Sequence, residues 1–192
     1  MKYSELLQFF KRQWAILLVL IVALAFFFFF SSFNFLSQDK HFVKWLSPVE
    51  TANYTVAKSY AETGSLQFFE KYNLIADDLI HPRSFRSDWG WVKPVSFLGV
   101  PLAYGFIARF FGSAVLPYLS PFFGALGILL FYLLIKELFG KKNALVSSLL
   151  LAVFPVYTYF SARSFFHNIF FIVATIGGLY FAVLMGKKKI AH

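Results

Sequence analysis

Four stretches of the chain contain no Asp, Glu, Lys or Arg, and each is long enough to cross a bilayer. They run from Gln13 to Gln38, from Phe110 to Ile135, from Asn143 to Ala162 and from Ser164 to Gly186. A membrane-spanning helix needs roughly 20 apolar residues, and a long uncharged run in a bilayer satisfies its backbone as a helix. The sequence therefore predicts an all-α, polytopic membrane protein with about four transmembrane helices.

A fifth apolar run, Pro94 to Ala108, is only 15 residues long and lies between Lys93 and Arg109. The positive-inside rule indicates whether it crosses, because Lys and Arg are rare in short external loops. With four spans and a cytoplasmic N-terminus, the lysines of 136–142 and 187–189 fall inside, whereas five spans would place both clusters outside. We therefore expect the fifth run to be an interfacial helix within a long external loop.

The four-span topology assigns residues 1–192 to a single membrane domain with a cytoplasmic N-terminus, in a plasma membrane that we expect to be prokaryotic. The first span is longer than the apolar core of a signal peptide, and no clear cleavage site follows it, so we interpret it as a retained anchor. The expected segments are a cytoplasmic start at 1–13, spans at 14–36, 118–137, 144–161 and 165–185, an external loop at 37–117 with helices at 48–63 and 94–111, and a cytoplasmic end at 186–192.

Composition excludes several classes of function. The net charge of +9 does not indicate nucleic-acid binding, because the basic residues lie mostly between the apolar runs, where a membrane protein carries them. The chain has no cysteine, which excludes disulfide scaffolds, thiolate zinc sites and cysteine nucleophiles. The interiors of the spans hold no ionisable residue, so we do not expect an ion-coupled transporter. The same spans leave little polar path for a lipid flippase or carrier, although Asn34, Thr158 and Thr175 keep this alternative open.

Seven of the nine acidic residues lie in the long loop. Its first part predicts a helix, with Ser47 as N-cap, Pro48 in the first position, Glu50 three residues after the cap and Gly64 beyond the end. For residues 65–91 we expect irregular structure. The turn between the third and fourth spans is expected on the same face, so the two could form a polar pocket for a lipid-borne substrate.

Several motifs along the chain resemble one enzyme family. Pro48-Val-Glu-Thr-Ala-Asn-Tyr54, with Gly64-Ser-Leu66 after it, is similar to the first external loop of the polytopic C-type glycosyltransferases, the protein O-mannosyltransferase-like and aminoarabinose-transferase-like enzymes. Residues 85–88 and 93–101 look like the Ser-Asp-Lys-x-Pro-Gly stretch of one bacterial and archaeal branch. Residues 138–142 and 159–167 resemble the internal and external turns of the family. The order and spacing of these motifs carry the resemblance over nearly the whole chain.

The resemblance implies transfer of a sugar from a polyprenyl-phosphate donor to an acceptor hydroxyl, which needs a base and a cationic site for the departing phosphate. Glu50 is the candidate base, although the family commonly has an Asp-Glu pair and Val49 stands in its first position. Asp88 is the second acidic candidate, to orient the acceptor or to hold a divalent cation with Glu50. Arg163 and His167 are the candidates for binding the donor phosphate, with Lys93 in reserve.

Each candidate also has a purely structural interpretation. Glu50 can complete a capping box, Asp88 can be a turn residue before Trp89, Arg163 can snorkel at a helix end, and His167 can contact lipid headgroups. No metal site is predicted and no cofactor is certain, although the resemblance leaves room for a divalent cation.

The sequence thus favours a membrane glycosyltransferase of the cell envelope that acts on the external face. The expected partners are a polyprenyl-phosphate sugar and the bilayer, not nucleic acid. The alternative is a non-catalytic membrane subunit or a degenerate paralogue of such an enzyme. Val49 favours this alternative, as does the end of the chain after the fourth span, since family members usually have more spans. The chain resembles the N-terminal part of such an enzyme, so a C-terminal portion or a partner subunit is a further expected partner.

Overall fold

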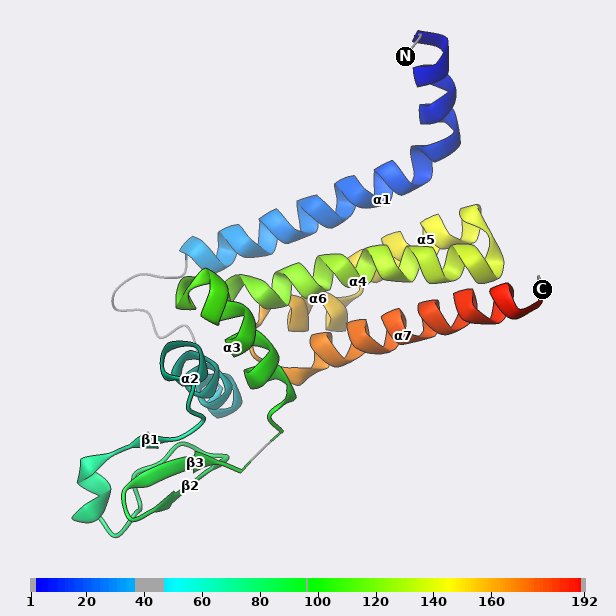
Figure 1. Ribbon diagram of the computed structural model, residues 1–192. Helices are drawn as coiled ribbons and strands as arrows, with labels where there is room; N and C mark the ends of the chain where they lie inside the picture. The colour runs from blue at the N-terminus through cyan, green and yellow to red at the C-terminus, as the bar shows by residue number, and fades with distance from the viewer. Residues whose placement is uncertain (1–2, 37–46, 96, 191–192) are drawn as a thin grey trace. The chain divides into compact units, whose positions relative to one another are not determined.

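A computed structural model describes residues 3–36, 47–95 and 97–190 of the chain, and most of these residues are helical (Figure 1). The elements, in chain order, are α1 (Tyr3–Leu36), α2 (Pro48–Thr63), β1 (Phe68–Phe69), η1 (Lys71–Leu74), β2 (Phe85–Asp88), β3 (Trp91–Pro94), α3 (Gly99–Phe111), η2 (Ser113–Val115), α4 (Leu116–Phe139), α5 (Lys141–Val153), α6 (Pro155–Ala162) and α7 (His167–Ile190). The predicted fold class, a polytopic helical membrane protein, is confirmed.

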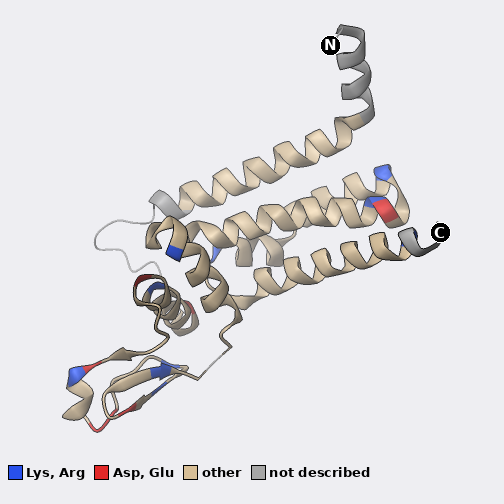
Figure 2. Cartoon of the chain, viewed as in Figure 1, with Lys and Arg blue, Asp and Glu red and all other residues tan. Residues whose placement is uncertain are grey.

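The chain divides into two compact units. The span unit comprises residues 1–30, 121–161 and 169–192, and the loop unit comprises residues 31–120 and 162–168. Where Figure 2 colours the helices of the span unit, Lys, Arg, Asp and Glu lie only near the helix ends. This distribution is what an apolar bilayer interior requires.

Three helical segments among the described residues are long and apolar enough to cross a membrane by themselves. They are Gln13–Phe33, Ser113–Phe139 and His167–Lys187. The predicted third span, 144–161, is a pair of helices, α5 and α6, bent by 58° at Phe154. The residue before a proline is disfavoured in the α-helical region, and Phe154 accordingly has extended backbone angles before Pro155. Counted as one broken span, the pair brings the total to four.

Small residues set the packing inside the span unit. Ala15, Val19 and Ala23 recur every fourth residue along α1 and are buried in its core. On α4, a Cβ added at Gly124 would lie 2.5 Å from the Ser161 hydroxyl, so α6 packs against α4 at a distance that only glycine allows. The Tyr157 hydroxyl donates a hydrogen bond of 2.6 Å to the Gly124 carbonyl across this contact.

Helix α2 confirms the caps expected from the sequence. The Ser47 side chain and the Glu50 carboxylate form a capping box, Pro48 occupies the first turn, and Gly64 ends the helix with a left-handed φ of 74°. The helix packs on α3, where a Cβ added at Gly105 would lie 2.7 Å from the Ala57 carbonyl oxygen. Glycine at this position lets the two helices of the loop unit lie backbone to backbone.

The stretch expected to be irregular, 65–91, contains part of a small antiparallel sheet with strand order β1-β3-β2 (Figure 1). Phe85 of β2 and Val92 of β3 are buried against Val56 of α2, and this apolar contact holds the sheet in place. The sheet also shifts the start of the interfacial helix. Pro94 pairs with Phe85 in the sheet, so the helix predicted at 94–111 begins at Gly99.

Candidate functional site

Glu50 and Arg163 form a buried ion pair in the loop unit, 113 residues apart in the chain. The Arg163 Nε atom donates to Glu50 Oε1 at 3.2 Å, and Nη2 donates to Oε2. The Glu50 side chain is 2% exposed and the Arg163 side chain 27% exposed. Parallel donation from a guanidinium to both oxygens of a carboxylate is the strongest form of such a pair. Glu50 and Arg163, which sequence analysis expected on one face of the membrane, are thus in direct contact.

The same carboxylate completes the cap of α2. The Ser47 backbone N–H donates to Glu50 Oε2 at 3.2 Å, and the Val49 N–H donates to the Ser47 hydroxyl at 3.3 Å. The structural and functional interpretations of Glu50 therefore coexist in one geometry. The cap fixes the side chain at the start of the helix, and Arg163 fixes its orientation.

The turn between α6 and α7 is held against α2 by a residue that sequence analysis missed. Asn53 is buried, lies one helical turn after Glu50, and donates from Nδ2 to the Phe165 carbonyl at 2.7 Å. The same Nδ2 lies 3.3 Å from Nε2 of His167. The spacing i, i+3 places Asn53 on the face of α2 that holds Glu50, which is the signal that could have identified it. One helix face therefore contacts Arg163, Phe165 and His167.

Phe165 has a left-handed backbone, with φ at 69°. Such a conformation costs roughly 1–3 kcal/mol for a bulky residue and persists only where the surroundings determine it. Its ring is fully buried against Tyr54 and Tyr104, and its carbonyl receives the Asn53 amide. The turn that presents Arg163 and His167 is thus fixed from both the side chain and the backbone of Phe165.

Hydroxyl groups attach this turn and α3 to the start of α4. Pro121 has no N–H to donate to the Pro117 carbonyl, and the buried Ser164 hydroxyl donates to it instead, at 2.8 Å. The Tyr104 and Ser120 hydroxyls lie 3.0 Å apart in a second buried hydrogen bond. Burial raises the pKa of Tyr104, so this hydroxyl stays protonated at ordinary pH.

Asp88 and Lys93 form a separate group on the β2–β3 hairpin. The Lys93 ammonium lies 3.4 Å from Asp88 Oδ2, and the Arg86 guanidinium lies 3.9 Å from the same oxygen. All three side chains are well exposed. Among the described residues, no recorded hydrogen bond or ion pair joins them to Glu50 or Arg163. The structure therefore brings Glu50, Arg163 and His167 together and leaves Asp88 and Lys93 paired with each other.

The described part of the chain, residues 3–36, 47–95 and 97–190, contains no binding site for a divalent cation built from three or more His, Cys, Asp or Glu side chains. Glu50 and Asp88, the pair considered for a cation, have separate partners of opposite charge.

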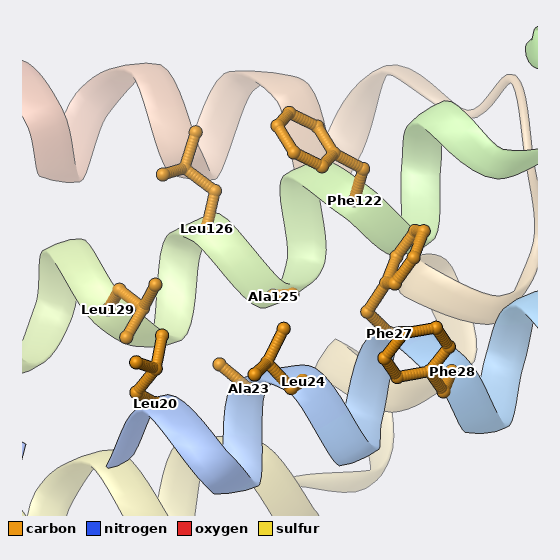
Figure 3. A pocket seen from close by; sticks show the side chains of 9 residues that line it. All are labelled: Leu20, Ala23, Leu24, Phe27, Phe28, Phe122, Ala125, Leu126 and Leu129. Carbon is orange, nitrogen blue, oxygen red and sulfur yellow. The ribbon is translucent and has the colours of Figure 1, made fainter. Parts of the chain in front are cut away.

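The span unit contains an apolar groove of about 250 Å³ between α1 and α4 (Figure 3). Its lining consists of Leu20, Ala23, Leu24, Phe27, Phe28, Phe122, Ala125, Leu126 and Leu129. Since every lining side chain is a hydrocarbon, the groove offers contacts to another hydrocarbon and no catalytic group.

Residues 95–190 match the model of the dolichyl-phosphate-mannose-protein mannosyltransferase family. The match begins just after β3 and covers half of the chain, including Arg163 and His167, while Glu50, Asp88 and Lys93 precede it. No curated protein and no solved structure shows significant similarity to the chain. The family model and the apolar helices agree on an integral membrane protein of the glycosyltransferase type. The chain therefore belongs to the dolichyl-phosphate-mannose-protein mannosyltransferase family.

Proposed function

We propose that the chain transfers a sugar from a polyprenyl-phosphate donor to an acceptor hydroxyl, at a site centred on Glu50 and Arg163. The family match supports a membrane glycosyltransferase that uses a lipid-linked sugar. The observation that carries the site is the buried ion pair, because it places an oriented carboxylate and a fixed cation in one position. Transfer requires a group of each kind.

In the proposed reaction, the acceptor oxygen attacks the anomeric carbon while the bond from that carbon to the phosphate oxygen breaks. Glu50 accepts the proton of the acceptor hydroxyl, and Arg163 stabilises the negative charge that develops on the departing polyprenyl phosphate. A guanidinium presents five N–H donors in a planar fork, so one group can bind a carboxylate and a phosphate together. His167 is proposed to contact the same phosphate.

Asp88 and Lys93 have secondary roles in this proposal. Asp88 orients the acceptor, and Lys93 is held in reserve for the phosphate. Their ion pair on an exposed hairpin leaves both side chains accessible to a ligand from solvent. A divalent cation is not needed in the proposed reaction, because Arg163 supplies the positive charge.

We further propose that the loop unit faces the outside of a prokaryotic plasma membrane and that the N-terminus is cytoplasmic. The lysine clusters at 136–142 and 187–189 support this orientation through the positive-inside rule. Because the chain has no cysteine, single variants Lys141→Cys and Asp88→Cys react with an impermeant thiol reagent without background. Labelling of Asp88→Cys but not Lys141→Cys in intact cells is expected. Labelling of both from one side would contradict the topology.

The test of the function is sugar transfer from a polyprenyl-linked donor in proteoliposomes. Glu50→Gln keeps the shape of the side chain and is expected to lower turnover by about 100-fold or more, since a general base contributes on the order of 10²–10⁴. Glu62→Gln on the same helix is the matched control, because Glu62 is exposed and, within the described residues, its carboxylate accepts a hydrogen bond from the Ser113 hydroxyl rather than from Arg163. Equal turnover of folded Glu50→Gln and wild type would remove Glu50 from the mechanism.

A further inference from the structure

We infer that Asn53 is a positioning residue that holds His167 as the neutral imidazole with its proton on Nδ1. The relevance of this inference to sugar transfer rests on the proposed function, but the inference itself concerns only the free protein. It changes the chemical role of His167 from a second cation to a neutral hydrogen-bond donor.

The first step of the argument fixes the orientation of the Asn53 amide. Its terminal atom lies 2.7 Å from the Phe165 carbonyl oxygen, which can only accept a hydrogen bond. The amide oxygen cannot occupy that position, because two acceptors would face each other there. The atom is therefore Nδ2, and the left-handed backbone of the buried Phe165 keeps the carbonyl in place.

In the second step, the orientation of the Asn53 amide determines which nitrogen of the His167 imidazole carries the proton. Nδ2 carries two hydrogens, and one is used by Phe165, so the other is available to His167 Nε2 at 3.3 Å. A contact with a donor requires a lone pair on Nε2. The cation and the Nε2-protonated tautomer both place a hydrogen there and would face the amide hydrogen. Only the neutral form with the proton on Nδ1 satisfies the contact.

The surroundings of His167 also disfavour a second positive charge. His167 is the first residue of α7, where the helix dipole presents partial positive charge. Arg163 lies four residues earlier and already supplies a cation to the same turn. On another side, the Phe97 ring meets the imidazole edge to face, at 6.0 Å between centroids. The site therefore presents one permanent cation and one neutral N–H donor, suited to an oxygen of the donor phosphate.

The deciding experiment reads the position of the proton directly. His41→Gln, His81→Gln and His192→Gln together leave His167 as the only histidine of the chain. In the full chain, labelled with ¹⁵N-histidine in micelles at neutral pH, a long-range ¹H–¹⁵N spectrum distinguishes a protonated ring nitrogen from one with a lone pair. We expect the proton on Nδ1 and the lone pair on Nε2. A proton on Nε2, alone or together with Nδ1, would overturn the inference.

Two variants test whether Asn53 is the cause. Asn53→Asp replaces the donor by a carboxylate that only accepts, so the proton is expected to appear on Nε2. Asn73→Asp is the matched control, because Asn73 is equally buried but bonds Ile80 and Ser87. An unchanged His167 spectrum in folded Asn53→Asp would contradict the assignment of cause to Asn53. If Asn53→Asp does not fold, the spectrum of the parent protein alone still decides the tautomer.

The transfer assay tests whether Asn53 affects binding of the donor. A purely structural role of Asn53 would leave the KM for the donor unchanged. Asn53→Asp is expected to raise the KM for the lipid-linked donor by about tenfold with a smaller change in kcat, because His167 would no longer present its Nδ1 hydrogen to the phosphate as a neutral donor. Asn73→Asp should leave the KM unchanged. Equal KM values for the two variants would overturn the ligand role. Absence of transfer in the unmodified protein would instead contradict the proposed function and leave the tautomer intact.

Discussion

The span unit and the loop unit bury polar side chains in different ways. In the loop unit, Glu50, Asn53, Asn73, Ser120 and Ser164 are buried, and each has hydrogen-bond partners on other segments. In the span unit, by contrast, the core is mostly apolar: the buried Ser148 hydroxyl donates within its own helix, and the Tyr157 hydroxyl donates to Gly124 across a helix contact. The buried hydroxyls of Ser161 in the span unit and of Ser31 at the start of the loop unit have no hydrogen-bond partner within the described residues. Close packing therefore dominates the contacts between the spans, whereas buried hydrogen bonds between distant segments are more frequent in the loop unit.

The largest difference in stability between variants of the two units is expected when one ion pair in each unit is broken. Arg163→Met leaves the Glu50 carboxylate buried without its partner, and we expect a loss of about 3 kcal/mol in the free energy of unfolding. Lys187→Met breaks the ion pair with Glu137, in which the Lys187 side chain is 54% exposed and the Glu137 side chain 30% exposed. This variant should lose less than about 1 kcal/mol in the free energy of unfolding. Thermal unfolding in detergent measures both.

A double variant sharpens this contrast. Glu50→Gln together with Arg163→Met removes the buried charge as well as its partner, so part of the lost stability should return. If Arg163→Met and Lys187→Met lowered the free energy of unfolding by the same small amount, the buried polar contacts would not determine the structure of the loop unit.

A smaller effect is expected from adding one methyl group at a helix contact in each unit. Gly105→Ala in the loop unit presses a Cβ onto the Ala57 backbone, which cannot move aside, and should cost about 1–3 kcal/mol. Gly127→Ala in the span unit presses a Cβ onto the buried Tyr157 hydroxyl, whose displacement would break its hydrogen bond to Gly124, so a comparable cost is expected. Gly178→Ala, with open space around the new Cβ, is the control. The same unfolding measurement compares the three, and a cost at Gly105 or Gly127 as small as at Gly178 would contradict this expectation.

The smallest effect is local and depends on pH. Hydrogen bonds from the Ser87 hydroxyl and the Gly90 and Trp89 N–H groups lower the pKa of Asp78 below its ordinary value of 3.8. A lowered folded pKa means that the carboxylate stabilises the hairpin above about pH 4 and that this contribution is lost as the pH falls through the folded pKa. Protection of the Trp89 and Gly90 amides from hydrogen exchange should therefore fall on acidification. In Asp78→Asn, the protection of these amides should not depend on pH in this range. The same pH dependence of protection in Asp78→Asn and in the wild type would show that Asp78 is not its cause.

Much of the fold could be predicted because its determinants are local. The uncharged runs predicted the spans, and Ser47, Pro48, Glu50 and Gly64 predicted α2, because caps act within one turn of a helix. The break at Phe154 was missed, although Pro155 marks it in the sequence. A proline within an apolar run does not by itself distinguish a kink from a continuous span.

The sheet could not be predicted from local pattern, because its strands are short and contacts distant in sequence hold it. Val92 is buried against Val56 of α2, and Asn73 fixes the loop by bonding the Ile80 backbone and Ser87. In the site, topology predicted that Glu50 and Arg163 face the same side. The direct ion pair and the hydrogen bond from Asn53 depend on the left-handed turn at Phe165. No residue type in the sequence predicts this turn.

The separation of Glu50 from Arg163 along the chain has a consequence for biogenesis. Helix α2 has its own caps and packs on α3, but 113 residues separate its Glu50 carboxylate from the Arg163 guanidinium. Until that arginine has been synthesised, the carboxylate cannot be buried with its partner. The 162–168 turn is therefore expected to dock onto α2 late in synthesis, after the rest of the loop unit has been made.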